Sequence, residues 1–482
     1  MRLPAALALI VLLWAAVYLP GLGTGEVRGE EARRVLPGRT MIQTGDWIVP
    51  RSAGKIYNRK PPGINWATAA AIKITGRMDE WTVRMPSVLG VLALALVIGT
   101  AMRGFLGADG ALLGALIMLT NIGFIEKGRL AEIEALYCAC FGIAIVSWLA
   151  LWWSGRTRAA WCLSLAVLGL GFLVKGPPHV WFFYAIVIAV LREEKRTREL
   201  LRRPHLAGLV IFFGTWAWWA LLNSGHNPQK DSGAVWMEQI THRLGFAEFD
   251  FTNWLLQIPQ SIVNFLPWAL LLPLVWRIPL VSDRCPVPHH DDARRSTLLA
   301  GLKKGLLAAF LVIALLPSSR PRFMLPLNAV AAILVAAAVQ GCAADWRRRL
   351  RPWVIGTMAA SVVGIGAYAM LLARGVVGGG ALRAFAREIE HHTGAPPQII
   401  LFRTPERMWP FYLGLGCREI ADLDDLPPRA RWVMTPGKDR EKNVSMLEHR
   451  YGSPKGQTVL KEPLTDDAGG KGWEYVLLEF PQ

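Results

Sequence analysis

Four short segments of the chain carry carboxylates and cations whose types and spacing suit the transfer of a phosphate-linked group. The first segment is the run GEEARR, which contains Glu30, Glu31 and Arg33. A carboxylate can accept the proton of an acceptor hydroxyl, while arginine and lysine neutralise the charge that develops on a departing phosphate. The residues therefore indicate a reaction in which a phosphate leaves as an acceptor oxygen attacks.

The other three segments supply further cations and another carboxylate. The run NRKPP contains Arg59 and Lys60, the run GRLAEIEA contains Glu134, and the run FLVKGPP contains Lys175. The two prolines after Lys60 restrict the backbone, so less entropy is lost when this segment binds an anion. Arg59 and Lys60 are therefore interpreted as a phosphate clamp.

Each segment also has a structural explanation that involves no catalysis. The two glutamates of the first run could begin a helix, where the macrodipole favours acidic side chains. Arg129 and Glu132 are three residues apart and could pair on a helix surface. Lys175 could reach the membrane interface as an anchor, and Lys60 could lie at the level of the lipid headgroups.

The remainder of the sequence is typical of a multi-pass membrane protein. Hydrophobic residues make up 53% of the 482 residues and charged residues only 18%. A membrane-spanning helix needs about 20 mainly apolar residues. We predict about eleven spans, near 4–22, 86–103, 109–126, 133–153, 159–174, 178–191, 206–223, 259–276, 298–316, 323–342 and 352–373. The fold class is expected to be mainly α, and the first span is expected to be retained because no small-residue cleavage site follows it.

Basic segments set the expected orientation. They follow the sixth, eighth and tenth spans, and the positive-inside rule places them in the cytoplasm. Eleven spans then put the amino terminus inside and the chain after Arg374 outside the plasma membrane. In this topology all four chemical segments face the outer side. The formal charge of +17 indicates contacts with anionic headgroups or phosphates, although positive-inside loops alone would produce some of the excess. No nucleic acid is expected as a partner.

Two domains are expected. Residues 1–374 would form the transmembrane domain, with 23–85 as its first extracytoplasmic loop. Residues 375–482 have the composition of a small α/β domain, with the strand-like runs PQIILF, RWVMT and WEYVLLEF and the helical runs ALRAFAREIEHH and PERMWPFYLG. The six cysteines include no CxxC pair and fall mostly in apolar runs, so neither a zinc site nor a disulfide framework is expected.

Several longer runs resemble a known family. The runs GEEARRVLPGRTMIQTGDWIVP, KIYNRKPPGINWATAAAIKITG and VRMPSVLG resemble the opening of the C-type glycosyltransferases that use polyprenyl-phosphate sugars. Within that group the chain looks most like the aminoarabinose transferase of lipid A and related members of the dolichyl-phosphate-mannose protein mannosyltransferase superfamily. The likeness continues through GRLAEIEAL, GLGFLVKGPPH, NFLPWALLLPL and RPRFMLPL, and covers most of residues 1–342.

The resemblance implies roles for individual residues. The acidic residue of the family's first outer loop falls on Glu30 or Glu31, and that of its second outer loop falls on Glu134. The family's lysine near the carrier phosphate matches Lys60. Arg59 stands where relatives can carry a metal-binding carboxylate. A guanidinium cannot ligate a cation, so no metal ligand is assigned. A divalent metal is left as a possible cofactor, and no cofactor is certain.

The resemblance also implies that the outer loop after the seventh span closes over the lipid donor. In this loop His242 and Arg243 are candidates for a second phosphate contact, or for a solvated helix face. Arg320 and Arg322 are weaker candidates near the tenth span. None of these residues identifies the sugar or the acceptor.

The expected function is transfer of a hexosyl or pentosyl group from a polyprenyl-phosphate donor to a lipid A-like or protein acceptor. Glu30 or Glu31 would act as the base, with Arg33, Lys60 and Lys175 stabilising the leaving phosphate. Direct displacement would invert the anomeric centre. The alternative is a carrier or flippase for anionic lipids without enzymatic activity, which would favour repeated halves and polar residues near the middle of the membrane.

Overall fold

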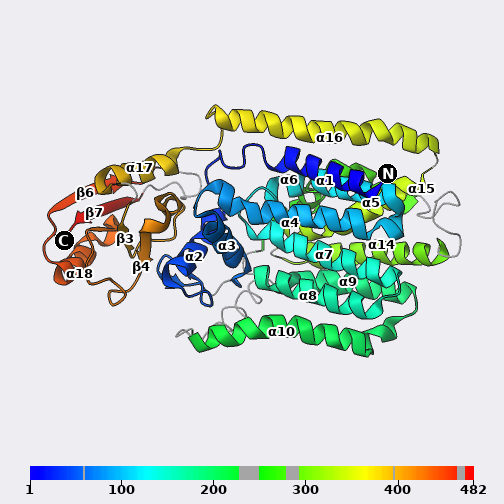
Figure 1. Cartoon of the computed structure of the whole chain (residues 1–482), viewed down its shortest axis with the longest axis horizontal. Helices are drawn as coiled ribbons and strands as arrows, with labels where there is room; N and C mark the ends of the chain where they lie inside the picture. Colours follow the sequence, from blue (N-terminus) through cyan, green and yellow to red (C-terminus); the bar gives the residue numbers. More distant parts are fainter. Residues whose placement is uncertain are drawn as a thin grey trace.

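A long helical bundle joined to a small domain at one end makes up the computed structural model (Figure 1). The structure describes residues 1–57, 60–226, 249–277, 292–317, 319–342, 344–394, 397–463 and 473–481. The bundle contains α1 (Leu3–Tyr18), α4 (Glu80–Ala101), α5 (Arg103–Thr120), α6 (Ile122–Lys127), α7 (Ile133–Trp153), α8 (Thr157–Lys175), α9 (Pro178–Glu193), η1 (Thr197–Leu201), α10 (Arg203–His226), α12 (Phe251–Val263), η2 (Trp268–Leu271), α13 (Leu272–Arg277), α14 (Asp292–Ala314), η4 (Pro321–Leu327), α15 (Asn328–Gly341) and α16 (Ala344–Ala373).

The bundle helices have the length and composition of membrane spans. Among the described residues, eight helices are long and apolar enough to cross a bilayer, or nine if the bent pair Phe251–Val263 and Trp268–Trp276 forms one span. The shorter helices α1 and α9, with 16 residues each, occupy the two remaining expected positions. The predicted mainly α, multi-pass bundle is confirmed.

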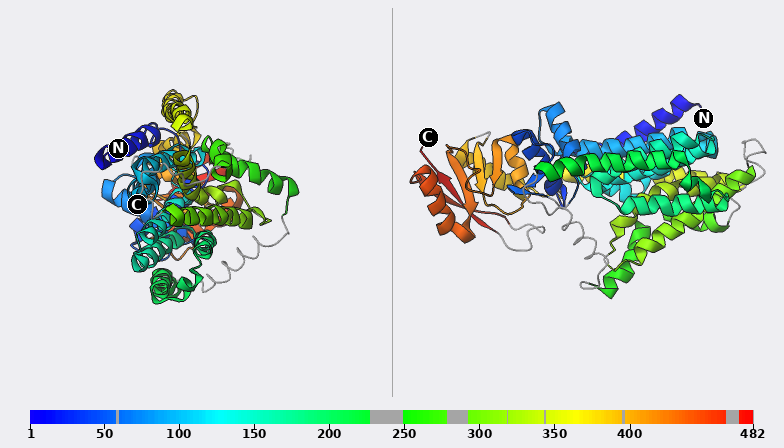
Figure 2. Two further views of the ribbon diagram at one scale, coloured as in Figure 1. Left: turned by 90° about the vertical axis from the view of Figure 1, so that its right-hand side faces the viewer. Right: turned by 90° about the horizontal axis from the view of Figure 1, so that it is seen from below.

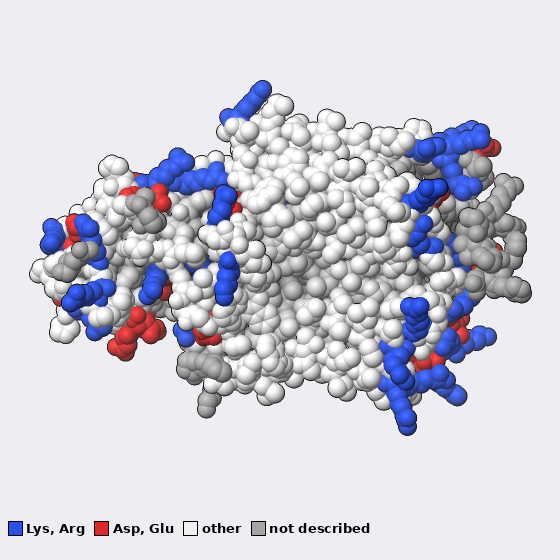
Figure 3. Space-filling model, in the orientation of Figure 1, with Lys and Arg blue, Asp and Glu red and all other residues white. Residues whose placement is uncertain are grey.

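On the face of the molecule shown in Figure 3, charged side chains gather toward the two ends. Figure 3 shows a broad band with almost no charge between these ends, as expected of a surface that faces lipid. The amino terminus and the α9–α10 and α15–α16 connections lie at the end opposite the small domain (Figures 1 and 2). The basic segments expected on one side of the membrane, so far as they are described, therefore share one end of the bundle.

The first long loop forms a compact layer between the bundle and the small domain. It contains α2 (Glu31–Thr44), β1 (Arg51–Ser52), β2 (Lys55–Ile56) and α3 (Gly63–Thr75). Glycines allow its close packing: a Cβ atom on Gly38 would lie 2.8 Å from the Asn65 carbonyl oxygen, and one on Gly63 would lie 2.7 Å from the Leu173 carbonyl oxygen. The loop therefore rests directly on α8, near the position of Lys175.

The carboxy-terminal domain is built on a mixed five-stranded sheet. Its elements are α17 (Ala381–Thr393), β3 (Ile399–Phe402), η5 (Trp409–Gly416), β4 (Cys417–Ile420), β5 (Trp432–Pro436), η6 (Gly437–Asp439), α18 (Arg440–Tyr451), β6 (Gly456–Lys461) and β7 (Glu474–Glu479). The strand order is β4-β3-β5-β7-β6, with β3 parallel to β4 and β5, and β7 antiparallel to β5 and β6. Ile399 lies opposite both Cys417 and Trp432. The predicted α/β unit is confirmed, while the helix expected over 405–414 is a 3-10 helix that begins at Trp409.

Helices cover both faces of this sheet, and one face also packs on the first loop. Leu447 of α18 belongs to one buried cluster, and Phe385 of α17 belongs to another that also contains Val35 and Leu36 of α2. The side chain of Gln43 donates hydrogen bonds to the carbonyl oxygens before and at the start of β4. The first loop and the carboxy-terminal domain therefore share a hydrophobic core. This core holds the carboxy-terminal domain over one end of the helical bundle.

Candidate active site

Glu30 lies immediately before α2 and faces a cavity between the first loop and the carboxy-terminal domain. Its two carboxylate oxygens lie 3.1 Å from Arg33 Nη1 and 2.7 Å from Arg34 Nη2. The cavity has a volume of about 260 Å³ and is also lined by Glu406 and Arg407. The Glu30 side chain remains 31% exposed, so its carboxylate is accessible from the cavity.

Glu31 is completely buried, and each of its two carboxylate oxygens accepts two hydrogen bonds. Its oxygens accept hydrogen bonds from Arg84 Nε and Nη2, both at 2.8 Å, and from the backbone N–H groups of Arg28 and Ala131 at 2.9 and 2.8 Å. These bonds tie α2 to α4 and to the turn before α7. The geometry therefore supports a structural role for Glu31, and Glu30 is the carboxylate of the two that a substrate can reach.

Glu134 and Lys175 form a buried ion pair at the same end of the bundle. Glu134 lies in the first turn of α7, and Lys175 is the last residue of α8, which ends at the following Gly-Pro-Pro run. Lys175 Nζ lies 3.1 Å from the Glu134 carboxylate, and both side chains are less than a tenth exposed. Arg322 Nε lies 3.7 Å from the same carboxylate oxygen. Tyr137 and Phe323 hold the ammonium group between their rings, at 5.0 and 5.2 Å from the ring centres.

A second buried pair, Lys127 with Glu132, lies on the turn between α6 and α7. Asn121 caps the start of α6 by accepting the Phe124 N–H at 3.0 Å, and this helix carries Lys127 at its end. Lys127 Nζ lies 3.2 Å from Glu132 Oε2. Burial raises the pKa of Glu132, and the nearby negative charge of Glu134 adds to this effect, whereas Lys127 opposes it.

A cationic cavity adjoins these two pairs. Its volume is about 340 Å³, and Lys127, Arg320 and Arg322 line it together with the acidic side chain of Glu126. Three cations around one cavity are suited to an anion that carries more than one negative charge, such as a phosphate. This cavity is therefore a candidate phosphate site at this end of the bundle.

The first loop and the α6–α7 turn meet directly. A Cβ atom on Gly29 would lie 3.1 Å from Glu132 Oε1, which places the residue before Glu30 against the turn. Arg34, which pairs with Glu30, is also close enough to Glu134 for their charges to attract. The structure therefore brings three of the predicted residues into one region, namely Glu30, Glu134 and Lys175.

The remaining predicted residues differ in how closely they join this region. Arg33 pairs with Glu30 on the side of the carboxy-terminal domain, where Glu406 lies 3.1 Å away. Lys60 is half-buried and precedes by three residues Gly63, which packs against Leu173 of α8, two residues before Lys175. Arg59, His242 and Arg243 lie outside the described residues.

Two polar residues of the site, Arg34 and Lys127, were not given a role from the sequence, and Glu132 was considered only as a helix-surface partner of Arg129, whereas it pairs with Lys127. Arg34 stands four residues after Glu30, a spacing that allows pairing on a helix and could have identified it. Lys127 and Glu132 are separated by a turn, and no local pattern predicts their contact. Over the part of the chain that the structure describes, no group of three or more His, Cys, Asp or Glu side chains could hold a metal ion.

Comparison with known proteins places this geometry in context. Residues 59–219 match the family model described as dolichyl-phosphate-mannose-protein mannosyltransferase. The chain is 30% identical over 350 residues to the undecaprenyl phosphate-alpha-4-amino-4-deoxy-L-arabinose arabinosyl transferase of Pectobacterium atrosepticum, covering 71% of this chain and 60% of the relative. It is 28% identical over 381 residues to the transferase of the same name from Edwardsiella ictaluri, covering 76% and 64%.

A solved structure shows the same fold over almost the whole chain. The structure of ArnT from Cupriavidus metallidurans bound to undecaprenyl phosphate has a TM-score of 0.68 to this chain and 18% sequence identity. The match covers 98% of this chain and 99% of the other. The chain nevertheless spans only about 60% of the length of the first curated relative above. The resemblance inferred from the sequence motifs is confirmed.

Proposed function

We propose that this chain, which shares the motifs and fold of the aminoarabinose transferase and dolichyl-phosphate-mannose protein mannosyltransferase superfamily, is an integral membrane glycosyltransferase. It takes a sugar from a polyprenyl-phosphate donor and transfers it to an acceptor on the extracytoplasmic face. The names of the curated relatives and the undecaprenyl phosphate in the related solved structure support a donor of this chemical class.

One observation carries the proposal. An accessible carboxylate, Glu30, lies beside a cluster in which Glu134 and Glu132 are matched by buried or half-buried cations. This cluster adjoins a cavity lined by three cations at the end of the bundle that the carboxy-terminal domain covers. A cation-lined cavity at a membrane boundary suits a lipid phosphate, and the adjacent carboxylate suits activation of a hydroxyl.

The reaction would proceed as a single displacement at the anomeric carbon of the sugar. The Glu30 carboxylate accepts the proton of the acceptor hydroxyl as its oxygen forms a bond to that carbon. The bond between the anomeric carbon and the phosphate oxygen breaks, and the polyprenyl phosphate leaves with both electrons. Attack opposite to the leaving group inverts the configuration at the anomeric centre.

The cations stabilise the phosphate as its charge grows. Lys175 is already held between two aromatic rings, so little reorganisation is needed when the leaving group becomes more negative. Arg322 and Lys127 line the adjoining cavity and would contact the phosphate oxygens. We assign Lys60, Arg59, Arg243 and Arg33 as supporting donors on the basis of the resemblance.

The domain division and orientation are part of this proposal. Residues 1–374 form the transferase domain, and residues 375–482 form the domain that covers its extracytoplasmic end. The clustering of the amino terminus and the basic connections at the opposite end supports a cytoplasmic amino terminus (Figure 1). The acceptor is a lipid A-like glycolipid or a protein, and the sugar is a hexose or a pentose.

A direct assay tests the function against the carrier alternative. Purified protein in vesicles is given a polyprenyl-phosphate sugar with a radiolabel in the sugar, together with an envelope lipid extract from cells that lack this protein. A transferase forms a new labelled glycoside, and Glu30→Gln should slow its formation about 10²–10⁴-fold. A carrier moves the label across the membrane without forming a glycoside, and that result would overturn the proposal.

A further inference from the structure

A two-residue β-hairpin of the first loop ends against the sheet of the carboxy-terminal domain. Its strands β1 and β2 pair antiparallel with Ser52 opposite Lys55, so Ala53 and Gly54 form the turn. Both turn residues have positive φ angles, of 50° and 74°, as a tight hairpin turn requires. Glycine adopts this backbone freely, whereas alanine adopts it only at a cost. The packing around the turn must therefore hold it in this conformation.

The turn meets backbone atoms of the other domain rather than flexible side chains. A Cβ atom on Gly54 would lie against the Ala421 nitrogen and 2.7 Å from the Ile420 carbonyl carbon, at the end of β4. A Cβ atom does not fit at such distances, and backbone atoms cannot rotate away as the end of a long side chain can. Any side chain at position 54 would therefore push the hairpin away from the sheet.

The end of β4 is itself fixed by neighbouring hydrogen bonds. The backbone N–H of Arg403 donates to the Ile420 carbonyl oxygen at 2.8 Å, and Arg403 Nε donates to the Ala421 carbonyl oxygen at 3.2 Å. β4 is also paired with β3 along all four of its residues. The hairpin therefore rests on a rigid surface and takes its position from the carboxy-terminal domain.

Residues of the hairpin connect this position to Glu30. Ser52 of β1 lines the cavity beside Glu30. Tyr57 follows β2 and donates its backbone N–H to the Pro50 carbonyl oxygen at 2.7 Å, which ties it to the base of the hairpin. The Tyr57 hydroxyl accepts a hydrogen bond from Arg34 Nη1, and Arg34 Nη2 holds the Glu30 carboxylate at 2.7 Å. A displaced hairpin would thus reach Glu30 through two successive contacts.

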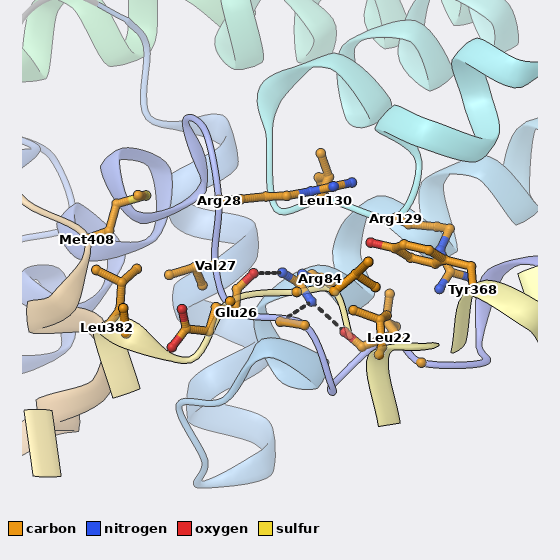
Figure 4. A pocket seen from close by; sticks show the side chains of 17 residues that line it. Leu22, Glu26, Val27, Arg28, Arg84, Arg129, Leu130, Tyr368, Leu382 and Met408 are labelled. Atoms are coloured by element: carbon orange, nitrogen blue, oxygen red, sulfur yellow. Dashed lines mark hydrogen bonds between the residues drawn. The ribbon is translucent and has the colours of Figure 1, made fainter. Parts of the chain in front are cut away.

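The carboxy-terminal domain is also attached at a second place, to the chain before α2 and to the start of α4. Arg383 of α17 donates its backbone N–H to Glu26 at 2.8 Å, and Tyr412 of η5 donates its hydroxyl to Glu80 at 2.9 Å. Figure 4 shows Glu26 at a cavity of about 630 Å³ beside the end of α16, which is also lined by Arg28, Arg84 and Arg129. Because these contacts do not involve the hairpin, the domain stays attached when the hairpin moves.

We propose that Gly54 is a positioning residue for the transfer reaction. Its docking on β4 lets the carboxy-terminal domain hold Tyr57 against Arg34, and Arg34 in turn orients the Glu30 carboxylate. Displacing a reacting group by about 1 Å can slow a reaction about 100-fold, so such support matters. The role in catalysis rests on the proposed function, in which Glu30 is the base, whereas the docking of the hairpin does not.

Gly54→Ala and Gly45→Ala form a matched pair of variants. Gly45 ends α2 with a φ of 75°, close to that of Gly54, but a Cβ atom there would meet no atom within 4 Å. Both substitutions place alanine in a left-handed backbone, and only Gly54→Ala pushes the hairpin off β4. Hydrogen exchange of the purified full chain, measured by mass spectrometry, should accelerate about tenfold within residues 51–57 in Gly54→Ala. In Gly45→Ala it should stay at the wild-type rate within these residues.

The rate of glycoside formation is then compared in two backgrounds. In the otherwise wild-type chain, Gly54→Ala should lower kcat about tenfold, and Gly45→Ala should change it less than about twofold. In a Glu30→Gln chain, adding Gly54→Ala should lower kcat no further, because the group that it positions is already gone. A loss of folded protein would instead lower kcat by the same factor in both backgrounds, so the comparison separates positioning from stability.

Tyr57→Phe provides the same test if Gly54→Ala does not fold. It keeps the ring and removes only the hydroxyl that accepts from Arg34, so kcat should fall about tenfold in the wild-type background and not in Glu30→Gln. Tyr451→Phe is the matched control. It removes a hydroxyl that donates to the Pro427 carbonyl oxygen at 2.8 Å, within the carboxy-terminal domain, and should leave kcat unchanged.

Three results would overturn the proposal: equal exchange and equal kcat in Gly54→Ala and Gly45→Ala, an unchanged kcat in Tyr57→Phe, or losses that simply multiply in the Glu30→Gln background. A failure of the proposed function gives a different pattern. If the wild-type chain forms no glycoside while exchange within residues 51–57 accelerates in Gly54→Ala alone, the docking stands and its catalytic role falls. If glycoside forms and Gly54→Ala accelerates exchange without lowering kcat, the positioning role is wrong while the transferase function stands.

Discussion

Arg39 of α2 and Glu419 of β4 form an ion pair across 2.8 Å, and both side chains are almost completely excluded from solvent. Arg39 also donates to the Pro410 carbonyl oxygen at 2.8 Å. Burial raises the pKa of Glu419, and the positive charge of Arg39 opposes that rise. This pair joins the first loop to the carboxy-terminal domain and thereby fixes the cavity in which Glu30 lies.

Arg39→Met should therefore loosen the domain from the first loop. The substitution leaves a buried carboxyl group without its cation, a change that typically costs about 3–5 kcal/mol. Proteolysis within residues 374–380 should accelerate and the apparent unfolding temperature should fall. Arg431→Met is the control, because its pair with Glu479 is exposed and should be worth about 1 kcal/mol or less. Equal behaviour of the two variants would show that the buried pair does not hold the domain.

Glu30 and Glu31 should respond in opposite ways to the same substitution. Glu30→Gln keeps a half-exposed side chain in place and should lower the rate of glycoside formation about 10²–10⁴-fold, the usual contribution of a general base. Glu31→Gln leaves the buried Arg84 without a full counter-charge, so it should mainly lower stability, by about 3–5 kcal/mol. Transfer rates and thermal unfolding of both purified variants separate the two roles. A stable but inactive Glu31→Gln would reverse the assignment.

Lys175 should act on both stability and chemistry, and a double variant separates these effects. Lys175→Met leaves the Glu134 carboxylate buried without its nearest cation and should both destabilise the protein and lower transfer at least about 100-fold. Adding Glu134→Gln removes the unpaired charge and should restore much of the stability. Transfer should stay low in the double variant if Lys175 acts on the phosphate.

The control for this series is Lys304→Met. Lys304 is exposed and pairs with Glu193 at the opposite end of the bundle, so its loss should change neither property appreciably. Recovery of transfer in the Lys175→Met, Glu134→Gln protein would assign Lys175 to a purely structural part.

The helices and most of the site could be predicted from the sequence because their signals are local. Apolar length identifies spans, and carboxylates or cations at the ends of spans identify Glu30, Glu134 and Lys175. Local patterns do not reveal partners far apart in the chain. Glu31 binds Arg84 from a different helix, so its structural part depends on tertiary packing that no spacing rule contains.

The missed elements of the carboxy-terminal domain have a similar cause. β6 is an edge strand, largely exposed, and its run GQTVLK has few apolar residues to indicate burial. β4 has only four residues, and two of them are charged. One of these, Glu419, is buried in an ion pair with Arg39 of the first loop, a partner that lies far away in the sequence. The cavity that Arg28, Arg84 and Arg129 line beside α16 was not predicted either, because it forms only where five distant parts of the chain meet.

The buried Glu132 gives a prediction about pH. Its pKa in the folded protein is raised, mainly by burial, above the value of about 4.3 expected in the unfolded chain. Its contribution to stability is therefore fully present below about pH 4.3 and is lost as the pH rises through the folded-state pKa. Glu132→Gln cannot ionise, so its unfolding temperature relative to wild type should rise as the pH increases from about 4 to 8.

Glu126→Gln is the matched control for this experiment. Glu126 contacts the same Lys127 at 3.4 Å but is half-exposed, so the unfolding temperature of this variant relative to wild type should change little over the same pH range. Thermal unfolding of the three proteins at several pH values provides the measurement. A relative stability of Glu132→Gln that falls with increasing pH would mean that the attraction of Lys127 outweighs burial, and that the ionised form of Glu132 stabilises the folded protein.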